Sequence, residues 1–220
     1  MGWQRAKYSE VRNKMQPGDV IAFGGKTHFS EVIKWATGSG VTHVGVILQS
    51  KLLIYDEIQS GYFTQIIESA NINGFRGVSI SRMSDRMNHY HGETWWLPLS
   101  EDVRKKLNFQ EFYSFLLHQD RKKYDLPQAI KSAVDSTDDI PLLRNASHAE
   151  EDFAKFFCSE LVAAGLEAGG VLPKLNASEI TPIELCRMKI FRGDYYQLKG
   201  PNRKIKGFNR MDPALWGEEE

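Results

Sequence analysis

The chain has 220 residues, which is enough for one substantial hydrophobic core but short for two full domains. Its 28 basic residues balance 28 acidic ones, and its hydrophobic content of 41% is ordinary for a globular protein. A formal net charge of zero argues against nucleic acid or an anionic membrane surface as a partner, and we expect one domain over residues 1–220.

The start of the chain shows no targeting signal. Residues 1–14 lack the apolar run of a secretory signal, and no stretch approaches the roughly 18 apolar residues of a membrane span. We therefore expect a cytoplasmic protein, or one delivered by a non-classical route, without an integral membrane segment. In a reducing compartment Cys158 and Cys186 are expected to be free thiols.

Strand patterns dominate the first hundred residues. The turn Pro17-Gly18-Asp19 leads from a short helix over 7–15 into an apolar strand over 20–23. β-Branched residues over 41–48, and an apolar run over 52–55 after a short polar link, predict a hairpin at the centre of a sheet. The other predicted elements are a buried helix at 29–35, a strand at 62–67 that pairs with the hairpin, and strands at 77–81 and 94–98.

Helical patterns dominate the second half. Amphipathic spacing predicts one long helix over 103–116 that ends in the basic cluster 121–123. Residues 135–151 are acidic and polar, which predicts an inserted surface loop and a candidate lid. A second strong helix is predicted over 153–168 and carries Cys158. The remaining elements are a short helix that begins at Thr181-Pro182, a last strand within 188–198, and a peripheral tail over 207–220.

Cys158 and His43 are the candidate nucleophile and general base. A thiol attacks a carbonyl carbon as the thiolate, so it needs a nearby imidazole or a helix N-terminus to lower its pKa. Strand alternation sends the His43 ring to one face of the sheet, and a helix packed on that face could present Cys158 to it. The alternative is that both residues are structural, since a lone strand histidine and a helix cysteine usually are.

Other chemically versatile residues are interpreted as structural. Glu160 lies two residues after Cys158, and helical geometry turns it away from the thiol. Cys186 is interpreted as a packing residue. The remaining histidines lack the spacing of metal ligands, so we expect neither a metal nor a cofactor.

Three groups of residues, taken together, resemble a known family. Pro17-Gly18-Asp19-Val20-Ile21, then Thr42-His43-Val44-Gly45-Val46, and later Phe157-Cys158-Ser159-Glu160-Leu161-Val162 are similar to the permuted branch of the NlpC-like papain-fold amidases, the YiiX/YaeF-like group. The histidine precedes the cysteine, the reverse of papain. The similarity extends through Tyr55-Asp56-Glu57, Lys123-Tyr124-Asp125 and Ser178-Glu179-Ile180-Thr181-Pro182, and so covers most of residues 15–185.

The resemblance implies an α+β fold of the papain-like, circularly permuted NlpC type, with an antiparallel central sheet or small barrel packed against helices. It also implies a third polar residue, on the strand after the histidine, that accepts the proton of the other ring nitrogen, and Glu57 matches it. Asp56 competes for this role, because neighbouring strand residues point to opposite faces. Tyr124 matches a family tyrosine that either borders the substrate cleft or packs half-buried.

The chemistry that the resemblance implies is acyl transfer by a cysteine hydrolase. His43 would take the thiol proton, Cys158 would attack an amide or ester carbonyl, and water would release the acyl group, with the Cys158 backbone N–H as an oxyanion donor. A cell-wall-type peptide amide is the first expectation for the substrate. The alternatives are a lipid acyl hydrolase, acyltransferase or thioesterase of the lecithin:retinol acyltransferase-like kind, and an inactive peptide- or lipid-binding module.

Overall fold

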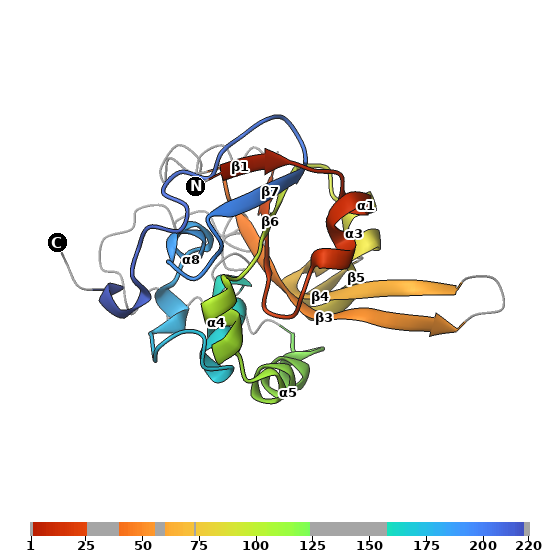
Figure 1. The fold of residues 1–220 in the computed structure, drawn as a ribbon. Helices are drawn as coiled ribbons and strands as arrows, with labels where there is room; N and C mark the ends of the chain where they lie inside the picture. Colours follow the sequence, from red (N-terminus) through yellow and green to blue (C-terminus); the bar gives the residue numbers. More distant parts are fainter. Residues whose placement is uncertain (1, 26–39, 56–59, 73, 124–157, 218–220) are drawn as a thin grey trace, which may run out of the picture.

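A seven-stranded sheet forms the centre of the computed structural model, which describes residues 2–25, 40–55, 60–72, 74–123 and 158–217 (Figure 1). The strands lie in the order β1-β7-β6-β2-β3-β4-β5. Neighbouring strands are antiparallel except for β1 and β7, so the sheet is mixed and open. The bounds of the strands are β1 Gly2–Arg5, β2 Val20–Gly24, β3 His43–Tyr55, β4 Ser60–Ile72, β5 Phe75–Arg82, β6 Glu93–Leu97 and β7 Asp194–Lys199.

Helices cover both faces of this sheet, which confirms the predicted α+β class (Figure 1). The α-helices are α1 Tyr8–Val11, α3 Met83–His89, α4 Glu101–Lys106, α5 Phe109–Gln119 and α8 Pro182–Arg187, together with a helix over residues 158–168. Three short 3-10 helices complete the list: η1 Arg12–Lys14, η3 Ala177–Glu179 and η4 Pro213–Leu215.

Strand alternation divides the apolar side chains into two hydrophobic clusters, one on each face. Val20 and Ala22 of β2 belong to the larger cluster, which α5, α8 and the helix over residues 158–168 cover. Ile21 and Phe23 of the same strand belong to the smaller cluster, which contains buried residues of α1 and α3. The sheet therefore separates the helix of Cys158 from helix α3.

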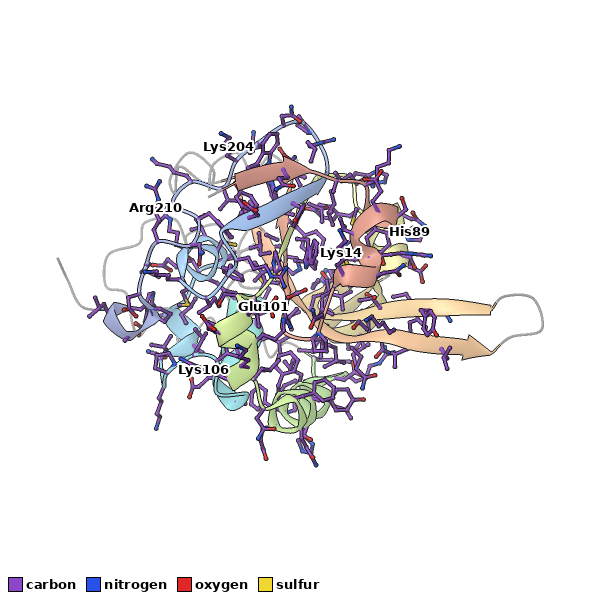
Figure 2. All side chains as sticks on the ribbon, in the orientation of Figure 1. Lys14, His89, Glu101, Lys106, Lys204 and Arg210 are labelled. Atoms are coloured by element: carbon purple, nitrogen blue, oxygen red, sulfur yellow. The ribbon has the colours of Figure 1, made fainter. Side chains whose placement is uncertain are left out.

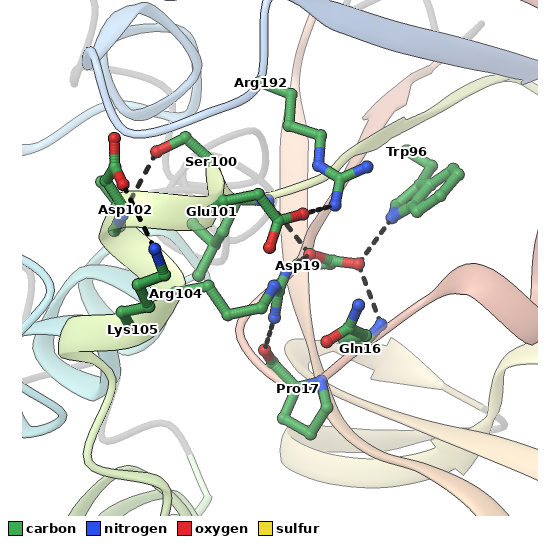
Figure 3. A network of polar contacts seen from close by, with 12 residues as sticks. Gln16, Pro17, Asp19, Trp96, Ser100, Glu101, Asp102, Arg104, Lys105 and Arg192 are labelled. Atoms are coloured by element: carbon green, nitrogen blue, oxygen red, sulfur yellow. Dashed lines mark hydrogen bonds and ion pairs between the residues drawn. The ribbon is translucent and has the colours of Figure 1, made fainter.

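Buried Asp19 holds three parts of this fold together (Figure 3). Its carboxylate accepts hydrogen bonds from the backbone N–H groups of Gln16 and Leu99 and from Trp96 Nε1, and it forms an ion pair with Arg104 of α4. Burial raises the pKa of Asp19 and outweighs the charge of Arg104 and these hydrogen bonds, which lower it. The Asp19 of the Pro17-Gly18-Asp19 turn is thus a structural residue, which joins β2, β6 and α4.

Figure 2 draws the side chains of the described residues, and several exposed charged residues are labelled in it. Figure 2 labels Lys14 of η1, Lys106 of α4, and Lys204 and Arg210 of the segment after β7, all of which are exposed.

The predicted hairpin at 41–48 and 52–55 is wrong. Residues 43–55 form the single strand β3, which pairs with β4 in an antiparallel register. The polar link is an irregularity inside that strand: the register shifts between Ile47 and Leu52, and Lys51 adopts φ 58°. A bulge absorbs extra residues without reversing the chain, and the following apolar residues keep the strand going.

The predicted long helix over 103–116 is also wrong, because it divides into α4 and α5. Leu107 has extended backbone angles, and the Asn108 side chain accepts hydrogen bonds from the N–H groups of Gln110 and Glu111. Asparagine is a strong N-cap, so a new helix begins there even though the apolar periodicity continues across it.

The remaining predictions had mixed outcomes. The strands at 20–23, 62–67, 77–81 and 94–98 and the short helix after Thr181 are confirmed, with a capping box at Thr181 and Glu184. Strand β1 was not predicted. The tail is not wholly peripheral, because Phe208 and Asn209 are buried and the Asn209 side chain bonds the backbone of Phe191. The predictions for 29–35 and 135–151 lie outside the described residues.

Candidate active site

His43 and Glu68 form a close polar pair on one face of the sheet. His43 is the first residue of β3, and Glu68 of β4 pairs with Gly45, two residues along β3. Diagonal neighbours of this kind leave the same face of a sheet, and His43 Nε2 lies 2.8 Å from Glu68 Oε2. The Glu68 side chain is fully buried and the His43 side chain is 14% exposed.

Cys158 hydrogen bonds to the His43 side chain, so the structure brings these two predicted residues together. Burial lowers the pKa of His43, but the Cys158 sulfur and Glu68 outweigh it and raise that pKa to about 9. Burial by itself raises the pKa of Glu68, but the hydrogen bond from His43 and the charge of Arg86 outweigh it and hold that pKa below its ordinary value. An ionised Glu68 only accepts hydrogen bonds, so Nε2 carries a proton and Nδ1 is the nitrogen that can exchange one with Cys158.

Cys158 and His43 approach each other from opposite sides of the sheet. Cys158 packs in the larger cluster with Val44, whereas the His43 ring lies 5.3 Å from that of Phe23, which belongs to the smaller cluster. The expectation that the helix of Cys158 packs on the face to which His43 points is therefore wrong. The pair still meets because His43 stands at the end of β3.

The backbone around His43 is fixed by the neighbouring strand. Thr42 N–H donates to Phe23 O over 2.9 Å, and Gly25 N–H donates to Thr42 Oγ1 over 3.0 Å, which extends the pairing of β2 and β3 beyond the start of β3. Gly45 lacks the Cβ that would lie 3.1 Å from Glu68 Cβ. A bare backbone at this position leaves room for the Glu68 side chain to reach diagonally to His43.

Arg86 is the second partner of Glu68. Its Nε donates to Glu68 Oε1 over 2.6 Å, from helix α3. The side chains of Cys158, His43, Glu68 and Arg86 therefore form a continuous row of polar groups that crosses the end of the sheet.

Cys186 and Cys158 are both fully buried in the larger cluster, but they differ in their partners. Cys158 hydrogen bonds to His43, whereas burial, followed by the proximity of Cys158, raises the pKa of Cys186 well above the ordinary range of a thiol. Both cysteines are free. The raised pKa of Cys186 agrees with the interpretation of Cys186 as a packing residue, since a protonated thiol is a poor nucleophile.

Three of the sequence-predicted residues, Glu57, Asp56 and Tyr124, lie outside the described part of the chain. Sequence reasoning missed Glu68, because the strand was predicted to end at residue 67. A signal was present: Glu68 is a lone charge in an otherwise uncharged run of residues 64–70, and such a residue in a buried strand needs a partner. The partner Arg86 could not be found without the tertiary structure.

Residues 2–25, 40–55, 60–72, 74–123 and 158–217 contain no group of three or more histidine, cysteine or acidic side chains that could hold a metal ion. Within the same ranges, no helix has the length and apolar character needed to cross a membrane. No family model and no curated protein matches this chain.

Proposed function

We propose that this chain is a cysteine hydrolase of the permuted papain-like kind, with Cys158 as nucleophile and His43 as general base. The observation that carries the proposal is the continuous contact from Cys158 through His43 to the buried, ionised Glu68. A nucleophile, a base and an orienting carboxylate in that order are the parts that thiol acyl transfer requires.

Glu68 takes the orienting role in this proposal. It binds the Nε2–H of His43, which fixes the tautomer and stabilises the imidazolium that forms when the thiol gives up its proton. Glu68 already accepts the hydrogen bond from His43 Nε2, so this role does not require Glu57, the residue that matches the family pattern. Glu57 stays a prediction, and the experiment below compares the two glutamates.

The reaction has two steps. His43 Nδ1 accepts the proton of the Cys158 thiol, the sulfur bonds to the carbonyl carbon, and the carbon–nitrogen bond breaks as His43 returns the proton to the leaving amine. Water then attacks the thioester while His43 accepts a water proton. The carbon–sulfur bond breaks and the carboxylic acid leaves. The Cys158 thiolate then lies beside His43, which holds the proton taken from water.

The proposed substrate is a peptide amide of the cell-wall type, on the strength of the sequence resemblance. An amide differs from a thioester in that its leaving amine must receive a proton, which His43 can supply. A matched set of peptide amide, oxyester and thioester substrates with the same acyl group tests this choice. Hydrolysis of the thioester and the oxyester alone would replace the amide with an activated acyl substrate.

The first test of the proposal is the pH dependence of iodoacetamide alkylation at Cys158, read by mass spectrometry of the labelled peptide. We expect fast labelling well below the pH of about 8.5 at which ordinary thiols ionise, and its loss in His43→Ala. Cys186 in the same chain is the internal control and should stay unlabelled.

A second comparison separates the two glutamates. Glu68→Gln should slow labelling at pH 6 by at least about tenfold, since an opposite charge at this distance shifts a pKa by roughly one to three units. Glu57→Gln should keep the wild-type profile. The reverse result would return the orienting role to Glu57. Labelling of the wild-type chain that resembles that of an ordinary thiol would overturn the enzyme proposal and leave a binding module.

A further inference from the structure

Arg86 is held beside the candidate site by two aromatic rings. Its side chain is 15% exposed, and its guanidinium carbon lies 4.9 Å from the ring centre of Phe23 and 4.9 Å from that of Tyr90. The same two rings are in edge contact, with centroids 4.8 Å apart. Two aromatic rings therefore fix the plane of the guanidinium while its Nε–H points to Glu68.

Helix α3, which carries Arg86, is itself held in place. Met83 and Met87 bury their side chains in the smaller cluster. From β7, the Lys199 ammonium donates to the carbonyl of Met87 over 2.7 Å and to that of Tyr90 over 2.5 Å, at the C-terminal end of the helix. A cation at this end also complements the helix dipole. Arg86 is thus presented to Glu68 by a fixed backbone.

Among the described residues that face Glu68, Arg86 is the one that carries a permanent positive charge. From β3 comes His43, whose charge depends on its protonation, and from β5 comes Ser79, which pairs with Glu68 in the register and is uncharged. Tyr90 follows α3, and burial raises its pKa, so it stays a neutral phenol. A carboxylate without exposed surface needs a compensating charge, because burial favours its protonated form.

A protonated Glu68 would disable the row of polar groups. It would no longer stabilise the imidazolium of His43, and the proton would then return to Cys158. The arrangement with alternating charges on sulfur, imidazole, carboxylate and guanidinium has no net charge. Without Arg86 it has one net negative charge in a buried site, which favours uptake of a proton.

We propose that Arg86 is a positioning residue of the active site, which keeps Glu68 ionised and turned toward His43 and thereby sustains the thiolate form of Cys158. It acts through Glu68 and does not need to touch the substrate. The inference rests on the proposed thiol chemistry and extends it by a fourth residue.

Three substitutions separate the charge of Arg86 from its hydrogen bond. In Arg86→Gln the amide nitrogen stands the same number of bonds from Cα as Arg Nε, so the donor to Glu68 stays and the charge is lost. Arg86→Lys keeps a positive charge but places it on a differently shaped side chain, and Arg86→Met keeps only the apolar part of the side chain. The matched control is Arg82→Gln, because Arg82 also stacks on an aromatic ring, Phe63 at 5.1 Å, at the start of the same helix.

The readouts are the pH profile of Cys158 alkylation and the NMR titration of the His43 ring, identified by its absence in His43→Ala. In Arg86→Met and Arg86→Gln the midpoint of labelling should rise by at least about one pH unit, and the His43 pKa should fall from about 9 toward 6.5. Arg86→Lys should restore most of both. Arg82→Gln should match the wild-type chain.

Two results would overturn the inference. Arg86→Met and Arg86→Gln that lose thermal stability but keep both wild-type profiles would show that Arg86 is structural. Arg86→Gln that behaves like Arg86→Lys would show that the hydrogen bond, not the charge, matters. Failure of the proposed function is distinct, because the wild-type chain itself would then lack labelling at low pH.

Discussion

Gly45 offers a sharp test of how tightly the candidate site is built. In Gly45→Ala the new Cβ would lie 2.9 Å from Ile66 Cδ1 and 3.1 Å from Glu68 Cβ. The Ile66 methyl is the end of a flexible side chain and can turn aside. Glu68 Cβ is attached directly to the backbone of β4, so a normal contact of 3.4 Å requires that strand to move by about 0.3 Å.

The energetic cost follows from two opposing effects. Overpacking of a buried site costs about 1–3 kcal/mol, and the loss of glycine freedom in the unfolded chain returns about 0.4–1 kcal/mol. We expect the free energy of unfolding to fall by about 1–2 kcal/mol and the 2.8 Å contact between His43 and Glu68 to weaken. Labelling of Cys158 at pH 6 should slow accordingly.

Urea-induced unfolding and the alkylation profile measure these two effects. Gly61→Ala is the matched control, because Gly61 lies in the same pair of strands and a Cβ there would meet nothing within 4 Å. This variant should be neutral or slightly stabilised, with unchanged labelling. Gly45→Ala that is as stable and as reactive as Gly61→Ala would refute the reasoning from close contacts.

Three further predictions concern single groups. The folded-state pKa of His43 is raised from 6.5 to about 9, so its contribution to stability is fully present below pH 6.5 and is lost as the pH rises through about 9. Urea unfolding measured between these pH values should show the decline in stability, and His43→Ala should lack it. Asp19→Asn leaves Arg104 without its buried counterion and should cost about 3–5 kcal/mol in urea unfolding, while the labelling profile of the folded protein stays the same. Cys186 should resist iodoacetamide at pH 9 in the folded chain and react only in denaturant, because burial raises its pKa and keeps the thiol protonated. Labelling of Cys186 in the native protein at this pH would contradict that protonation state.

Local chemistry made much of the fold predictable. β-Branched and apolar runs located β2, β5 and β6, and Thr181-Pro182 located α8, because these signals depend on residues close in sequence. The polar link at 49–51 was misinterpreted for the same reason, since a bulge and a turn have similar composition and only the partner strand distinguishes them.

The candidate site was only partly predictable. Cys158 and His43 were selected from their motifs, and the structure places their side chains in contact, while their catalytic roles stay a prediction. Glu68 and Arg86 do not follow, because their roles depend on the register of β3 with β4 and on the packing of α3 against Phe23, which are long-range properties of the fold. A pattern within one segment carries no information on such contacts.

The row of polar side chains from His43 to Arg86 also has a bearing on the order in which the candidate site assembles during synthesis. His43, Glu68 and Arg86 are contributed by residues 43–86, a continuous stretch whose strands pair with their sequence neighbours, and such local contacts form early. Cys158 and the clamp from Lys199 emerge from the ribosome much later. The imidazole, carboxylate and guanidinium of this row can therefore come together first, and the thiol of Cys158 meets the imidazole only when most of the chain has been made.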